Sequence, residues 1–171
     1  MGIDLKNWMQ NLPDGSDLLA LNLCGTHDCV TQHIRLPHFF CCQDLTVYEQ
    51  LLLGVRALDI RVRADGKCLT MVHGIFPAYN HSCHRANLMD MGDVLSQCYR
   101  FLDECPGEAV VFQFKNDNGK ENEQCFDNLF YTYIKGKEPY WYLEDRVPTL
   151  GAARGKLVLI RRCKMEPKPD F

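Results

Sequence analysis

Residues 56–64 read RALDIRVRA, and this short stretch decides the fold. Its side chains alternate strictly, so Leu58, Ile60 and Val62 share one face of a strand and charged side chains occupy the other. The charged face carries Asp59 and two arginines. The pattern predicts a strand that packs on a core through one face and offers polar groups on the other.

Other strands and helices are predicted on both sides of this stretch. Strand-like runs alternate with helical patterns, which is typical of βα units and a parallel sheet, and so of an α/β protein. One domain covering residues 1–171 is expected from the length and from the 46% hydrophobic content. The predicted strands are 20–23, 57–63, 69–73, 109–115 and 157–162, and the predicted helices are about 46–55, 88–104 and 121–133.

Composition excludes several classes of function. The net charge of −3 and the scattered basic residues give no reason to expect a nucleic-acid partner. No apolar stretch approaches the roughly 18 residues that cross a bilayer. The polar N-terminal segment predicts no signal peptide, so the compartment stays open.

Ten cysteines are many for a chain of this length. Most lie in apolar runs, where a free thiol acts as a small hydrophobic group, so reduced cysteines are favoured over disulfides. The adjacent Cys41-Cys42 pair and the cluster at 81–84 could hold a soft metal. No Cys-x-x-Cys pair occurs, however, and we expect no metal site and no cofactor.

Polar side chains gather where the predicted strands end. In βα barrels, the carboxyl ends of the strands carry the active site. The residues at these positions are His27, Asp28, Arg61, His73, Lys115 and Arg162.

This set suits the cleavage of a phosphodiester without a metal ion. One histidine can take a proton from an attacking hydroxyl while the other gives a proton to the leaving oxygen. A fixed guanidinium can stabilise the charge that develops on the phosphate. Asp28 could hold Arg61 in place or share a proton with the leaving group.

Several motifs together resemble the X region of bacterial-type phosphatidylinositol-specific phospholipase C. The resemblance runs from about Asn7 to Cys163 and implies a TIM-type (β/α) barrel. Each motif alone is weak, but the set is specific. The motifs are NWMQNLPDGSDLLALNL (7–23), CGTHDC (24–29), GVRALDIRVR (54–63), LTMVHG (69–74), EAVVFQFK (108–115) and RGKLVLIRR (154–162).

The resemblance also implies roles for individual residues. His27 matches the general base that deprotonates the inositol 2-hydroxyl, and His73 matches the general acid for the diacylglycerol oxygen. Arg61 matches the arginine that stands where eukaryotic relatives hold calcium. Asp28 matches the aspartate that works with this arginine, and residues matching Lys115 and Arg162 contact the inositol ring. The implied substrate is phosphatidylinositol at a membrane surface, and the product is a cyclic inositol phosphate.

The family's barrel has more strands than this chain supplies. The resemblance therefore implies a barrel truncated to about its first five strands, with a C-terminal segment or a partner missing. It also implies that the aspartate that orients His27 is absent, which would leave the tautomer of His27 unset. An open sheet would expose edge strands and an apolar flank.

Two other classes of function stay open. One is a metal-dependent phosphodiesterase of the glycerophosphodiester or sphingomyelinase type, which needs clustered carboxylates near the first histidine. The other is a phosphoinositide-binding module without turnover. We also expect Asp59 and Arg63 to form an ion pair that lines the barrel rather than to act in chemistry.

Overall fold

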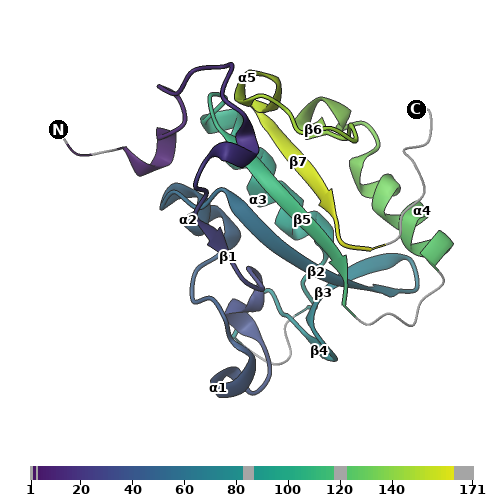
Figure 1. The fold of residues 1–171 in the computed structure, drawn as a ribbon. Helices are drawn as coiled ribbons and strands as arrows, with labels where there is room; N and C mark the ends of the chain where they lie inside the picture. The colour runs from purple at the N-terminus through teal and green to yellow at the C-terminus, as the bar shows by residue number, and fades with distance from the viewer. Residues whose placement is uncertain (1, 3, 83–86, 118–122, 164–171) are drawn as a thin grey trace.

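The structure is a computed structural model that describes residues 2, 4–82, 87–117 and 123–163. A twisted sheet crosses the molecule, and helix α3 (Met91–Glu104) lies behind it in the view of Figure 1. Parallel strands form the main part of this sheet, as the βα pattern predicts. Their order is β1 (Gly25–Thr26), β2 (Ala57–Asp65), β5 (Ala109–Asn116), β7 (Lys156–Arg161) and β6 (Trp141–Tyr142).

Two of the predicted strands differ in the structure. The segment 20–23 forms no strand. A 3-10 turn over Leu18–Ala20, capped by the Asp17 side chain, overlaps its first residue. The strand over 69–73 exists as β3 (Cys68–His73), but it runs antiparallel to β2. A tight turn at Gly66, with φ of +65°, joins the two strands, and a connection this short cannot produce a parallel pair. Strand β4 (Phe76–Pro77) extends this antiparallel arm.

The helices begin and end close to their predicted positions. Asp90 caps α3 and accepts a hydrogen bond from the backbone of Gly92, while Asp93 completes a capping box. The predicted helix over 121–133 corresponds to α4, although residues 121 and 122 lie outside the described part of the chain. No helix among the described residues is both long and apolar enough to span a membrane. The helices besides α3 are α1 (Pro37–Phe40), α2 (Val47–Leu52), α4 (Glu123–Ile134) and α5 (Leu150–Ala153), with 3-10 turns at Leu5–Asn7, Leu18–Ala20, Thr31–His33 and Glu138–Tyr140.

Alternation along the strands separates two apolar clusters. The outward side chains of β2, such as Leu58 and Ile60, are fully buried in the main core with Phe112 and the helices. A smaller cluster covers the first half of the inner face, where Val111 and Val158 pack against the N-terminal segment that contains Met9. This arrangement matches the interior of a barrel, filled with side chains below its active end.

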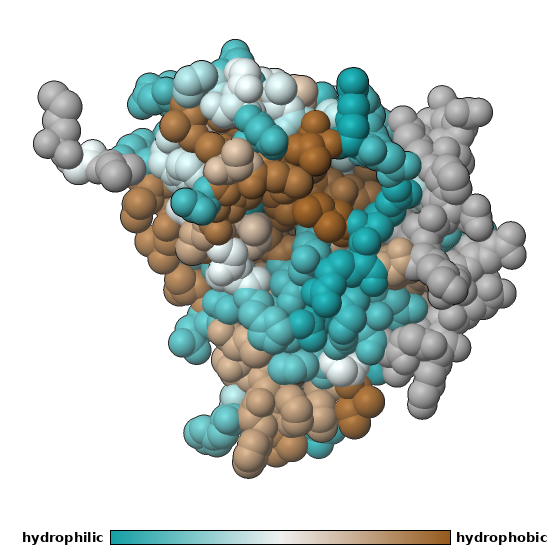
Figure 2. Space-filling model, viewed as in Figure 1, coloured by the Kyte–Doolittle hydropathy of each residue, from teal (hydrophilic) through white to brown (hydrophobic). Residues whose placement is uncertain are grey.

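The inner face changes character along each strand. It begins with small apolar residues and ends with polar ones, as in the series Val111, Gln113 and Lys115 on β5. Figure 2 shows the result, with an apolar patch over the upper part of β5 and β7 and hydrophilic surface below it. The polar side chains of the inner face therefore lie at one end of the sheet.

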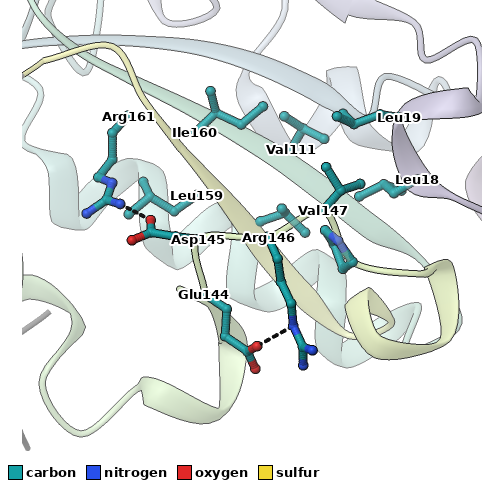
Figure 3. Close-up of a pocket in the computed structure, with 12 residues that line it drawn as sticks. Leu18, Leu19, Val111, Glu144, Asp145, Arg146, Val147, Leu159, Ile160 and Arg161 are labelled. Atoms are coloured by element: carbon teal, nitrogen blue, oxygen red, sulfur yellow. Dashed lines mark hydrogen bonds and ion pairs between the residues drawn. The ribbon is translucent and has the colours of Figure 1, made fainter. Parts of the chain in front are cut away.

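An apolar hollow of about 360 Å³ opens on this inner face (Figure 3). Leu18 and Leu19 face Val111 and Val147 across it, and two ion pairs, Arg161–Asp145 and Arg146–Glu144, stand at its rim. The apolar side chains exposed at this hollow are Leu19 and Val147, whereas Val111 and Val158 are buried under the N-terminal segment. The expected exposed apolar flank is therefore limited to this hollow, and most of the inner face is covered.

Candidate functional site

The polar ends of the strands converge as predicted. His27 and Asp28 follow β1, and His73 ends β3. Arg61 lies in the middle of β2, near the end of its parallel pairing with β5. These four side chains form one cluster, because each of the other three lies within ion-pair distance of Asp28.

Asp28 is the centre of the cluster. It is fully buried, and its φ of +44° places it in the left-handed region, which aspartate tolerates better than most residues. Its Oδ1 lies 3.2 Å from Arg61 Nε, and its Oδ2 lies 3.2 Å from His27 Nε2 and 3.6 Å from His73 Nε2. Burial raises the pKa of Asp28, and the charge of Arg61 offsets only part of that effect.

Arg61 is held by carboxylates on several sides. Its Nη2 lies 3.0 Å from Asp59 Oδ2, and its Nη1 lies 3.7 Å from Asp117 Oδ1. Burial alone would lower the pKa of Arg61, but the hydrogen bond to Asp59 and the charges of Asp28 and Asp117 outweigh it and raise that pKa. The guanidinium is thus permanently charged and fixed in one orientation.

The predicted ion pair between Asp59 and Arg63 is wrong. Arg63 pairs with Asp65, at 2.8 Å between Nη2 and Oδ2. Asp59 instead contacts Arg61 and accepts a hydrogen bond from Gln113 Nε2 at 3.1 Å. Burial disfavours the Asp59 carboxylate, but the hydrogen bonds from Arg61 and the Asp28 backbone hold its pKa below the ordinary value.

His27 has a carboxylate at each ring nitrogen. Its Nδ1 lies 3.1 Å from Asp59 Oδ2 and its Nε2 3.2 Å from Asp28 Oδ2. Arg61 Nη2 also approaches Nδ1, at 3.1 Å, so Nδ1 donates to Asp59 in one tautomer and accepts from Arg61 in the other. Asp59 thus supplies a carboxylate beside Nδ1 from β2, while the contact with Arg61 leaves both tautomers of His27 possible. That His27 lacks the family's own orienting aspartate stays a prediction.

His73 faces the same space from the opposite side. Its Nδ1 lies 3.1 Å from the carbonyl oxygen of Phe40, which can accept only from a protonated Nδ1. This contact leaves Nε2 directed toward Asp28. The centroids of the His27 and His73 rings are 6.3 Å apart. Two imidazoles at this spacing can serve opposite sides of one reacting group.

Lys115 and Arg162 lie at the edge of the cluster. Lys115 donates a hydrogen bond to the Asp117 carboxylate, and Arg162 Nη1 lies 3.7 Å from Asp59 Oδ1. Arg161 pairs with Asp145 instead, so the structure assigns the two adjacent arginines to different sides of β7. A hollow of about 310 Å³ adjoins the cluster, lined by His27, Asp59, Arg61, Gln113 and Arg162 together with backbone and apolar atoms of β1, β2 and β5.

The pH dependence of stability tests the contacts of Asp117. Although burial would raise its pKa, hydrogen bonds from Lys115 and the Gly74 backbone hold that pKa below the ordinary value of 3.8. A lowered carboxyl pKa contributes stability above the unfolded value, and this contribution is lost as pH falls through the folded value. Asp117→Asn should therefore lower the free energy of unfolding by about 1–2 kcal/mol at neutral pH. The difference should begin to shrink as pH falls below about 4 and should vanish only once pH is below the lowered folded pKa. Urea melts of both proteins across this range measure it, and a difference independent of pH contradicts the assignment.

Sequence reasoning did not assign three polar residues to the site. Alternation places Asp59 on the face of Arg61, but Asp59 was expected to pair with Arg63 rather than to contact His27 and Arg61. Asp117 and Cys42 lie in loops, where no periodicity predicts their position. The possible metal cluster at 81–84 cannot be assessed, since Cys83 and His84 lie outside the described residues.

Comparisons with known proteins agree with the fold. No family model matches the chain. It is 27% identical over 169 residues to the 1-phosphatidylinositol phosphodiesterase of Listeria monocytogenes, an alignment that covers 92% of this chain and 49% of the relative. The structure resembles the phosphatidylinositol-specific phospholipase C of Staphylococcus aureus with a TM-score of 0.77 and 28% identity, over 93% of this chain and 53% of the other. The corresponding Listeria enzyme gives a TM-score of 0.76 at 27% identity, over 94% and 57%.

These similarities confirm the resemblance to bacterial-type phosphatidylinositol-specific phospholipase C and its TIM-type barrel. The chain spans about half the length of the curated relatives it matches.

Proposed function

We propose that this chain carries the catalytic cluster of a phosphoric diester lyase. Its substrate is phosphatidylinositol, which it cleaves to diacylglycerol and a cyclic inositol phosphate. The observation that carries the proposal is the ion pair between the buried Asp28 and the partly buried Arg61, flanked by two histidines. The guanidinium lies among the carboxylates, where it supplies the positive charge that a metal ion supplies in a metal-dependent phosphodiesterase.

Each residue has a defined step in the proposed reaction. His27 accepts the proton of the inositol 2-hydroxyl, whose oxygen forms a new bond to phosphorus. The bond from phosphorus to the diacylglycerol oxygen breaks, and His73 gives that oxygen a proton. The nucleophile is already tethered to the phosphate, so the step gains from proximity.

Arg61 stabilises the charge on the phosphate oxygens while Asp28 and Asp59 hold its guanidinium in place. The raised pKa of Asp28 also fits a carboxyl that shares a proton with the leaving group. Lys115 and Arg162, at the edge of the cluster, are proposed to contact the inositol hydroxyls. This arrangement requires the substrate to enter from a membrane surface facing the ends of the strands.

We further propose that a C-terminal barrel segment or a partner covers the inner face in the active protein. The apolar hollow beside Val111 and Val158 supports this, together with the partial coverage of the relatives. An apolar dye that finds no accessible surface on this chain in solution would contradict it.

The test of the lyase is cleavage of phosphatidylinositol vesicles by this chain in excess EDTA. Phosphorus NMR should show a cyclic inositol phosphate, and His73→Ala should lower its rate of formation by about a hundredfold or more. His38→Ala is the matched control, because this histidine lies on α1 and not among the catalytic residues. Product that requires added calcium or magnesium contradicts the role of Arg61. No product from a folded sample favours a phosphoinositide-binding module or a chain that needs the further barrel segment or partner for activity.

A further inference from the structure

Cys42 brings a thiol to the catalytic cluster. It lies in the loop after α1, with its Sγ 3.9 Å from His73 Nδ1. One ligand atom each from His27, Asp28 and Cys42 lie within 4.8 Å of one another. We propose that these three residues form an inhibitory site for a thiophilic divalent metal ion such as Zn²⁺.

The donor set fits zinc chemically. Thiolate, imidazole and carboxylate are the three ligand types that Zn²⁺ takes in proteins, at about 2.0–2.3 Å. Tetrahedral bonds of that length separate ligand atoms by about 3.3–3.8 Å. His27 and Asp28 come close to this spacing, at 3.2 Å. Because all three ligand atoms lie within 4.8 Å of one another, Cys42 needs only a small side-chain movement to join them. Water would take the fourth position.

Asp28 supplies the observation that points to a ligand. Both of its carboxylate oxygens are buried and have no hydrogen-bond partner, although they lie within ion-pair distance of Arg61 and the histidines. Buried carboxylate oxygens are rarely left in this state. Oδ1 faces Arg61, while Oδ2 faces His27 and His73 and is the oxygen available to a metal ion.

Neighbouring residues position two of the proposed ligands, His27 and Cys42. His27 can donate Nδ1–H to Asp59 and present Nε2, an arrangement common for histidines that bind zinc. The backbone N–H of Cys42 donates to Thr31 Oγ1 at 2.8 Å, and that hydroxyl donates to the Asp28 carbonyl at 2.9 Å. The buried Thr31 thus ties the loop of the thiol to the loop of the carboxylate.

In the bound state, the Asp28 carboxylate and a Cys42 thiolate would balance the two positive charges of the ion, while Asp59 balances the nearby Arg61. The site is open to solvent through His27, whose side chain is 60% exposed.

Binding would stop the proposed reaction, because the metal occupies the Nε2 lone pair of His27 and the space between the two imidazoles. Metal binding itself does not depend on the proposed function, whereas inhibition does. The two can therefore fail separately in the experiment.

The experiment titrates the EDTA-stripped and dialysed chain with Co²⁺, a spectroscopic substitute for Zn²⁺. We expect a thiolate-to-cobalt charge-transfer band that an equimolar addition of Zn²⁺ removes. Cys42→Ser should lose this band, and Cys68→Ser, which changes an exposed thiol on β3, should keep it. His27→Gln, a second variant at an exposed position, should weaken Co²⁺ binding. Asp59→Asn should weaken it by about ten- to a hundredfold.

A second measurement follows lyase rates with and without Zn²⁺, each relative to the metal-free rate of the same variant. Inhibition of the unmodified chain that is lost in Cys42→Ser supports the site. A band that is absent from the unmodified chain, or that persists in Cys42→Ser, overturns it. A normal band without lyase activity in EDTA leaves the metal site standing and counts against lyase activity of this chain on its own.

Discussion

Replacing Arg61 with lysine is expected to lower the rate of phosphatidylinositol cleavage on the order of 10³-fold, as for other arginines that stabilise a transferring phosphoryl group. Lysine keeps the positive charge but loses the planar fork that contacts several oxygens at once. In the structure that fork reaches Asp28 and Asp59 simultaneously, at 3.2 and 3.0 Å. An ammonium group cannot hold both carboxylates and a phosphate in the same geometry.

Arg63→Lys is the matched control for this prediction. Arg63 lies on the same strand and the same face, two residues further along, and pairs with Asp65 away from the cluster. Single-turnover cleavage in EDTA compares the two variants, and urea melts establish that both are folded. If Arg61→Lys cleaves as fast as Arg63→Lys, the guanidinium does not stabilise the transition state.

The central strands could be predicted because apolar and polar residues alternate along them, with one face toward the core and the other toward the site. On β2, Leu58 and Ile60 face the helices while Asp59 and Arg61 face the site, and a single-strand pattern contains that information. The same reasoning failed for 20–23, whose alternation is equally regular. The chain there follows a 3-10 turn and lies over the inner face of the sheet without joining it.

The site could be predicted as a set of residues, but its contacts could not. His27 and Arg61 were found because strand ends converge in a parallel sheet. Which carboxylate contacts which nitrogen depends on the path of the loops, and so the role of Asp59 beside His27 required the structure. Cys42 was assigned only to a thiol pair, because sequence gives no sign that its loop returns to Asp28.

Replacing Arg56 with methionine should destabilise the fold by about 3–5 kcal/mol, the usual cost of leaving a buried ion-pair partner alone. Arg56 and Glu108 are both fully buried, with Nη2 2.7 Å from Oε2. The guanidinium also lies over the Phe101 ring, 4.6 Å from its centroid. Because Glu108 is fully buried, bulk water does not solvate its carboxylate once the guanidinium is removed.

This pair joins the N-terminal segment to the base of the sheet. Arg56 Nη2 donates to the Lys6 carbonyl at 2.8 Å, and Glu108 accepts from the Met9 backbone at 3.0 Å. Since Arg56 directly precedes β2 and Glu108 directly precedes β5, loss of the pair frees the segment that packs on the first half of the inner face.

Urea unfolding of three variants measures the effect: Arg56→Met, Glu108→Met and the double variant. Each single variant leaves one buried charge unpaired, whereas the double variant leaves none, so it should be more stable than Arg56→Met alone. The Met9 N–H loses its acceptor in the double variant, which should keep it below the unmodified protein. If the two single effects simply add, the charges do not interact as a buried pair and the segment is held by apolar packing alone.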